Sequence, residues 1–308
     1  MPQFPWPALD LARECNGPPR VPFLLAERPG APSGTVLGSV AIPHVDALRA
    51  WPDAFELDVD AAAGTPRAVL LRLAAGVRDA RLAAIHARLH ADGLIRGWRD
   101  EPYPLRDRLG GEHGTIERAA SRFWGTMTWG AHCNGYVADG AGRPTHLWIA
   151  RRAESKPTDP GRLDNLVGGG VPRGQSPREA VVREGWEEAG LEAARMTGLA
   201  EGGVIELECD VPEGRQHERL FVFDLALPGG FVPRIVDGEV AEHRLMTVAE
   251  AIARSAAGEL TTDAALVTLD FALRHRLIEP NAAGAESTAA GVSERQLEAF
   301  EALRPPRR

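Results

Sequence analysis

A glycine-rich loop leads into a helix with well-defined ends near the middle of the chain, in residues 168–191. Ser176 is a favourable N-cap, Pro177 suits the first helical position, and Glu179 stands where a capping box needs a carboxylate. Gly190 can adopt the left-handed conformation that commonly ends a helix. The sequence therefore predicts an amphipathic helix between Ser176 and Gly190, with backbone free of side chains directly before it.

The predicted helix carries an acidic face beside its apolar stripe. The stripe is formed by Val181, Val182, Trp186 and Ala189. Glu184, Glu187 and Glu188 follow one another at i, i+3 and i+4, so their carboxylates repel unless water or a cation screens them. Arg183 can pair with Glu187 but leaves net negative charge on this face. Mg²⁺ favours such oxygen ligands and completes its coordination with substrate phosphates.

A solvated helix surface is the alternative explanation of an acidic helix face. The preceding loop favours a metal site, because its glycines let backbone carbonyls and amides approach a metal and a diphosphate closely. These glycines are Gly168, Gly169, Gly170 and Gly174. We therefore predict that the loop and the helix together form a metal–diphosphate site.

The segment resembles the Nudix box, Gly-x5-Glu-x7-Arg-Glu-U-x-Glu-Glu-x-Gly-U, in which U is a bulky aliphatic residue. The residues that match it in register are Gly169, Arg183, Glu184, Glu187, Glu188, Gly190 and Leu191. Gln175 replaces the first Glu of the motif, and Gly185 replaces its aliphatic residue. The resemblance implies an α/β fold, an α/β/α sandwich around a mixed sheet, together with hydrolysis of a diphosphate bond.

The resemblance also implies roles for residues of the box. Glu184, Glu187 and Glu188, with the backbone of Gly169, would hold Mg²⁺ or Mn²⁺. Glu184 is alternatively the general base that deprotonates water, and Arg183 would orient the glutamates.

Further candidates lie outside the box. Arg152 and Lys156 follow a predicted strand and precede the glycine loop, where cations can bind a phosphate. Trp129 could stack on a heteroaromatic ring of the substrate, although aromatic residues in strands more often belong to a core. Glu239 and Glu242 are second-line candidates for the base or a further metal ligand; surface positions on an edge strand are the alternative.

Longer segments around the box indicate a narrower resemblance. Residues 132–137 (HCNGYV), 155–171 and 231–246 resemble a Nudix subfamily that acts on thiamine diphosphate and its damaged forms. In fungi this module is fused to thiamine pyrophosphokinase, and residues 98–105 (WRDEPYPL) resemble the end of the subfamily's N-terminal domain. We therefore expect hydrolysis of thiamine-type diphosphates to the monophosphate. The oxidised forms should react faster, because their neutral ring would stack in an apolar slot beside Trp129 or Trp148 without the desolvation cost of the cationic thiazolium.

Two alternatives to this function remain open. One is another diphosphate reaction on the same fold, either hydrolysis of ADP-ribose or a nucleotide sugar, or isomerisation of isopentenyl diphosphate. Residues 166–168 hold no Cys where the isomerase needs one. The other is a Nudix module that binds a ligand without catalysis, because Gln175 and Gly185 depart from the box. The retained Arg-Glu-x-x-Glu-Glu favours an enzyme.

The chain is expected to form two domains and a tail. Residues 1–115 predict a smaller α+β domain of unknown role, residues 116–280 the Nudix domain, and residues 281–308 a loosely held tail. Strands are predicted over 36–42, 55–59, 125–137, 145–151, 196–207, 219–227 and 239–246. Helices are predicted over 43–51, 78–94, 248–255 and 262–276 as well as in the box.

Composition limits the partners. A net charge of −8 and a pI of about 5.7 argue against nucleic acid or an anionic membrane surface. Cys15, Cys133 and Cys209 are widely spaced and predict free thiols in a reducing compartment. We see neither a signal peptide nor an apolar run near the roughly 20 residues that a membrane helix requires. We expect a cytoplasmic protein whose partner is a small-molecule diphosphate, with a homodimer as the assembly to consider.

Overall fold

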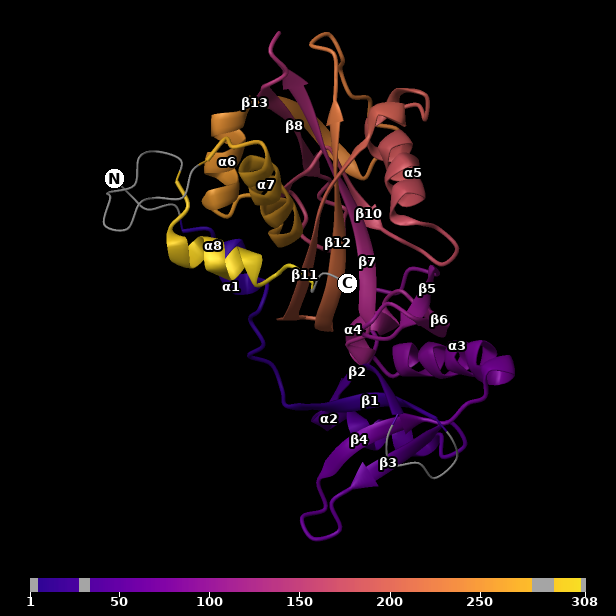
Figure 1. The fold of residues 1–308 in the computed structure, drawn as a ribbon. Helices are drawn as coiled ribbons and strands as arrows, with labels where there is room; N and C mark the ends of the chain where they lie inside the picture. The colour runs from indigo at the N-terminus through magenta and orange to yellow at the C-terminus, as the bar shows by residue number, and fades with distance from the viewer. Residues whose placement is uncertain (1–4, 28–33, 279–290, 306–308) are drawn as a thin grey trace.

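The N-terminal part of the chain is built on a four-stranded sheet (Figure 1). The computed structural model describes residues 5–27, 34–278 and 291–305. The strand order is β2-β1-β4-β3, with β1 parallel to β4 and antiparallel to β2. The bounds are β1 Arg20–Ala26, β2 Gly34–Ala41, β3 Phe55–Val59 and β4 Pro66–Leu71. The strand expected at 55–59 is confirmed as β3.

Helices complete this first unit. Helix α3 (Ala75–Ala91) buries Leu82 and Ile85 in the core that also holds Phe23 of β1. Where the sequence predicts one helix over 43–51, the chain forms a short α-helix followed by a 3₁₀ helix. Their bounds are α2 Ile42–Val45 and η1 Asp46–Ala50.

The rest of the chain forms a nine-stranded sheet within the described residues. Five strands follow the order β11-β12-β7-β5-β6, while β10 and β8 also pair with β7, and β13 and β9 pair with β8. The bounds are β5 Pro102–Arg106, β6 Glu112–Glu117, β7 Met127–Ala138, β8 Pro144–Arg152, β9 Leu163–Asp164, β10 Val167–Gly170, β11 Ala200–Val211, β12 Gly214–Ala226 and β13 Val240–Thr247. Strand β7 is parallel to β12 and antiparallel to β8, so the sheet is mixed, as expected.

Helices cover both faces of the larger sheet (Figure 1). Helix α5 (Pro177–Ala189) packs on one face through a core that includes Ala131, Val181 and Phe223. Helices α6 (Val248–Ala256) and α7 (Thr262–Arg274) pack on the other face, where Leu220 and Leu266 are buried together. This arrangement confirms the predicted α/β/α sandwich around a mixed sheet.

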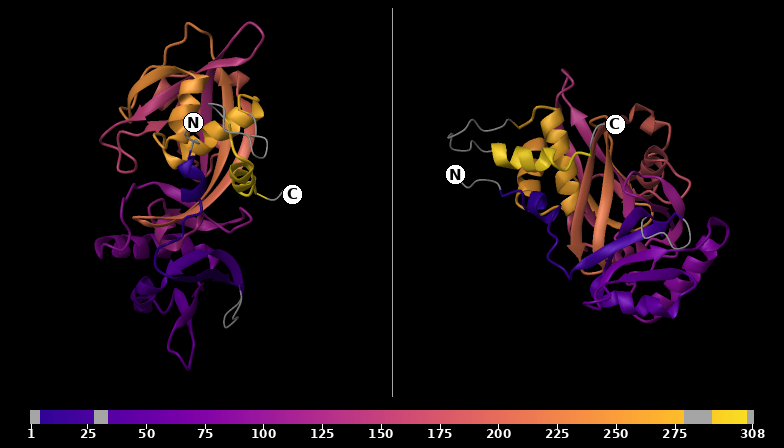
Figure 2. Two further views of the ribbon diagram at one scale, coloured as in Figure 1. Left: turned by 90° about the vertical axis from the view of Figure 1, so that its left-hand side faces the viewer. Right: turned by 60° about the horizontal axis from the view of Figure 1, so that its bottom comes forward.

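Two short terminal helices extend the second layer. Helices α1 (Pro7–Leu11) and α8 (Glu294–Glu301) lie beside each other, and α1 also contacts α7 (Figure 2). The tail was expected to be loosely held from residue 281. Instead, Phe300 and Leu303 of residues 291–305 are buried in the same core as the apolar residues of α7. The apolar side of α8 packs against that core.

The segment between the two sheets differs from the expected boundary at 115/116. That boundary falls inside β6, and both β5 and β6 belong to the larger sheet through the pairing of Arg106 with Met127. Residues 98–105 were compared above with the end of the subfamily's N-terminal domain. Tyr103 and Leu105 of this segment also enter the core of the first unit. The β5–β6 pair therefore joins the two units.

Local sequence explains why α5 begins and ends where it does. The Ser176 hydroxyl accepts from the Glu179 amide at 3.2 Å, and the Glu179 carboxylate accepts from the Ser176 amide at 2.8 Å. Gly190 ends the helix with a φ of 64°, as predicted. Within the described ranges, no helix combines the length and apolar character that crossing a membrane requires.

Candidate active site

A cavity of about 480 Å³ opens at the junction of the two units. Strand β10 and the segment after β8 form part of its wall, and residues between 96 and 122 form another part. The polar side of β7 and the start of α7 close it. Because the glycine loop lies in this wall, the cavity is the place where the box residues can meet a ligand.

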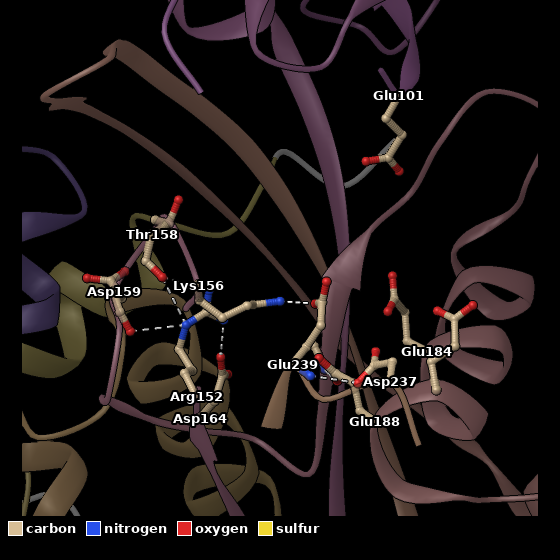
Figure 3. Close-up of polar contacts among 12 residues, drawn as sticks. Glu101, Arg152, Lys156, Thr158, Asp159, Asp164, Glu184, Glu188, Asp237 and Glu239 are labelled. Carbon is tan, nitrogen blue, oxygen red and sulfur yellow. Dashed lines mark hydrogen bonds and ion pairs between the residues drawn. The ribbon is translucent and has the colours of Figure 1, made fainter. Parts of the chain in front are cut away.

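Two glutamates of α5 lie against the glycine strand β10. A Cβ at Gly169 would overlap the Glu184 carboxylate, so only glycine permits this approach. The Glu188 carboxylate accepts a hydrogen bond from the Gly168 amide at 2.9 Å. Figure 3 shows Glu184 and Glu188 on one side of Glu239, with Arg152 and Lys156 on the other. The strand thus brings two carboxylates and its own backbone together.

Burial of these two carboxylates disfavours their ionised forms unless a positive charge lies nearby. Burial raises the pKa of Glu184 to about 7, although Arg183 opposes the shift. Glu188 is 6 % exposed, and burial together with the charge of Glu184 raises its pKa well above the usual value. A buried carboxylate supported by one backbone hydrogen bond is costly unless a cation or a proton offsets it.

These oxygens fit a hard divalent cation such as Mg²⁺ or Mn²⁺. Among the described residues, no group of three or more His, Cys, Asp or Glu side chains is arranged to hold a metal by itself. Mg²⁺ commonly binds one or two carboxylates and takes its remaining ligands from water and substrate phosphates. Glu184 and Glu188, with the Gly169 backbone, suit that mode of binding.

Glu187 stands apart from the pair that faces the glycine strand. Its carboxylate binds Arg183 at 2.7 Å, and the same guanidinium binds Glu184 at 2.8 Å. The Gln175 amide oxygen accepts from Arg183 at 3.3 Å, where the box expects a carboxylate. Arg183 therefore binds two glutamates of the box, and Gln175 contacts it without adding charge.

Arg152 lines the cavity but is already engaged by its own loop. It binds Asp164 at 2.9 Å and the carbonyl oxygens of Thr158 and Asp159 at 2.8 and 3.2 Å (Figure 3). Its guanidinium holds the segment between β8 and β9 in place. The phosphate-binding role expected of Arg152 is thus better described as positioning this wall of the cavity.

Lys156 and Glu239 form an ion pair at the cavity wall (Figure 3). Although burial raises the pKa of Glu239, the hydrogen bond and charge of Lys156 bring it below its usual value. The ion pair with Lys156 therefore favours the ionised form of Glu239. Glu242 instead pairs with Arg151 and Arg244 at 2.7 and 2.8 Å and lies outside the cavity lining.

Trp129 lies on the opposite side of β7 from the cavity lining. The Arg106 guanidinium sits 3.8 Å from its ring centroid, and Phe221 packs against its edge. Side chains alternate along a strand, so Thr128 and His132 point to the cavity while Trp129 points away. The expected stacking of Trp129 on a substrate ring is therefore wrong, because the residue is committed to packing near α5.

Sequence reasoning missed the polar end of the cavity. His132 binds Asn165 at 3.0 Å behind the glycine strand. Glu218 and Asp263 also line the cavity, and burial and the charge of Glu218 raise the pKa of Asp263 to about 7. The alternation of Thr128, His132 and Asn134 along an otherwise buried strand is the pattern that could have revealed this surface.

Two models of known protein families match the chain. Residues 132–267 match the family model of the NUDIX domain, and residues 24–128 match the model of a domain of unknown function, DUF4743. The chain carries a Nudix domain, and a DUF4743 domain precedes it.

Curated relatives bear the same family name. Nudix hydrolase 20, chloroplastic, of Arabidopsis thaliana is 39% identical over 196 residues, which covers 62% of this chain and 51% of that protein. Nudix hydrolase 24, chloroplastic, of the same plant is 38% identical over 195 residues, with coverages of 62% and 53%. The chain thus spans about half the length of these relatives. Among solved structures, DR0079 from Deinococcus radiodurans is 25% identical, with a TM-score of 0.42 and coverages of 56% and 99%.

Proposed function

We propose that the protein is a divalent-metal-dependent hydrolase that cleaves the diphosphate bond of a small organic diphosphate. The observation that carries this proposal is the buried pair Glu184 and Glu188, which lies directly behind Gly168 and Gly169, while these glycines and several cations line the cavity. Buried carboxylates beside a glycine backbone would hold a divalent metal, and the nearby cations would attract the phosphates of the substrate.

The residues of the chain have separate tasks in this reaction. The Gly168 amide fixes Glu188, and Arg183 fixes Glu184. A bound metal would neutralise negative charge on the phosphates and lower the pKa of a bound water. Lys156 would turn from Glu239 to a phosphate oxygen, which leaves the Glu239 carboxylate free to accept a proton. Glu239 is thereby the candidate base if Glu184 is occupied as a ligand.

We propose thiamine-type diphosphates as the substrate class within this reaction. The segments that resemble the thiamine-directed subfamily contribute His132, Lys156, Asp164 and Glu239 to the lining of one cavity. The polar end offers the Glu218 and Asp263 oxygens to hydrogen-bond donors such as an aminopyrimidine. The expected preference for the oxidised ring relied on an apolar slot with Trp129, and the lining next to β7 is polar instead.

A panel of diphosphates assayed with Mg²⁺ tests both parts of the proposal. The panel holds thiamine diphosphate, its oxidised forms, ADP-ribose and a nucleotide sugar, and kcat/KM is measured for each. We expect a thiamine-type compound to exceed ADP-ribose by at least about tenfold. The reverse order would overturn the substrate class and leave the hydrolase. Absence of turnover across the panel, with Mg²⁺ or Mn²⁺, would favour a ligand-binding module.

A further inference from the structure

The β5–β6 segment that joins the two units contributes side chains to the wall of the cavity. Arg99 precedes β5, Tyr103 lies in β5 and Arg118 follows β6, and all three line the cavity that the glycine strand β10 borders. These residues fall within the DUF4743 match, residues 24–128. They lie outside the Nudix box, and the proposed reaction has so far given them no task.

The Tyr103 hydroxyl is a buried polar group aimed at the glycine strand. Tyr103 is 2 % exposed, and its Oη has no hydrogen-bond partner among the described residues. A Cβ at Gly170 would overlap this oxygen, so the glycine is what lets the hydroxyl reach the strand. Buried hydroxyls without a partner are rare because they have lost their hydrogen bonds to water. A ligand oxygen beside Gly170 would supply the missing partner.

Arg118 stands next to that hydroxyl. Arg118 lies over the Tyr103 ring at 5.3 Å, and a Cβ at Gly170 would be 3.5 Å from its Nη2. Its Nη1 binds Glu101 at 2.9 Å, and Figure 3 shows Glu101 opposite Glu184. The other end of this guanidinium thus points toward the glycine strand.

Arg99 carries a positive charge that the described residues leave without a partner. Its guanidinium makes no hydrogen bond or ion pair in the described parts of the chain, although Glu239 and Glu101 lie in its vicinity. Burial lowers the pKa of Arg99, and the nearby charges of Arg118 and Arg152 lower it further. Arg99 thus adds a positive charge beside Arg118 and Arg152, which an anion in the cavity would offset.

We propose that Arg99, Tyr103 and Arg118 form an anion clamp by which the DUF4743 domain completes the active site. The clamp binds a phosphate of the diphosphate beside Gly170, next to the glycines that contact Glu184 and Glu188. Arginine suits this task because its planar fork matches phosphate oxygens, and the tyrosine hydroxyl adds a further donor. This inference rests on the proposed function for the identity of the anion, and it gives the N-terminal domain a role in substrate binding.

Binding of inorganic diphosphate with Mg²⁺, measured by isothermal titration calorimetry, tests the clamp without needing turnover. We expect Arg99→Gln and Arg118→Gln each to weaken binding about tenfold or more, and Tyr103→Phe to weaken it less. Arg118→Lys should retain part of the affinity because it keeps the charge. Arg88→Gln is the matched control, since Arg88 lies in α3 and pairs with Asp92 away from the cavity.

The outcomes separate the clamp from the proposed reaction. Thermal unfolding confirms that each variant is folded, and the best substrate of the diphosphate panel gives KM and kcat. A raised KM with a smaller change in kcat in Arg99→Gln and Arg118→Gln supports the clamp. Binding and KM within twofold of the parent protein would overturn the clamp and leave the hydrolase standing. Arginine-dependent binding without turnover of any diphosphate would refute the reaction and retain the clamp. A parent protein that binds no inorganic diphosphate contradicts the clamp.

Discussion

Glu184 and Glu188 determine the chemistry of the site because the fold buries both carboxylates next to each other. Arg183 binds both Glu184 and Glu187, and the Gly168 amide donates a hydrogen bond to Glu188. Neither contact cancels the charge of the pair. The site is therefore least stable when it is ionised and without metal, and a divalent cation has most to contribute under those conditions.

The pKa of Glu184 predicts how stability changes with pH in chelator-treated protein. The folded state raises this pKa from 4.5 to about 7, so the folded state holds the proton more tightly than the unfolded chain. The resulting stabilisation is complete below about pH 4.5 and is lost as the pH rises through about 7. Its upper limit is about 3 kcal/mol.

Urea unfolding at pH 5 and pH 8 measures this contribution. Glu184→Gln should remove it, so the parent protein should lose more stability between the two pH values than the variant does. Added Mg²⁺ should restore stability to the parent protein at pH 8. An equal loss in both proteins would show that Glu184 is ionised in the folded state without metal.

Among the secondary-structure elements, α5 was the one best specified by local sequence. Its cap, its first proline and its terminal glycine act within a few residues, so the sequence predicts its ends correctly. The sequence predicted less well which side chains of β7 point toward the cavity and which point toward α5. Moving by one residue along a strand exchanges its two faces, and the sequence around Trp129 does not show which face α5 covers. The position of the box glutamates beside the glycine loop was therefore predictable, whereas the polar end of the cavity was not, nor was the separation of Glu187 from Glu184 and Glu188.

The cap of α5 gives a test of how this helix is held. Ser176→Ala removes the hydroxyl that accepts from the Glu179 amide and should cost about 1 kcal/mol of unfolding free energy. Ser155→Ala, at an exposed turn, is the control and should stay within about 0.5 kcal/mol. Urea unfolding compares the two. Equal stabilities would mean that packing alone fixes the start of α5.

For the molecule as a whole, the β5–β6 pair connects a four-stranded sheet to the Nudix sandwich and places the first unit at the cavity. No local pattern predicts that connection, since Arg99 and Gly170 are far apart in the sequence and line the same cavity only because β5 pairs with β7. The sequence did indicate two units, the mixed sheet and the glycine–glutamate site. The sequence did not reveal the pairing of β5 with β7, which lets residues of both units line one cavity.

The most direct test of the metal–diphosphate site is Mg²⁺-dependent turnover of the diphosphate panel by Glu188→Gln. This change keeps the shape of the side chain and removes its charge, while Glu192→Gln serves as an exposed control of the same chemistry. We predict that Glu188→Gln folds normally and loses at least about a hundredfold in rate, as expected when a charge-stabilising group is removed from such a site. Glu192→Gln should retain the rate of the parent protein. Turnover by Glu188→Gln within a few-fold of the parent protein would contradict the assignment of this glutamate pair as the metal site.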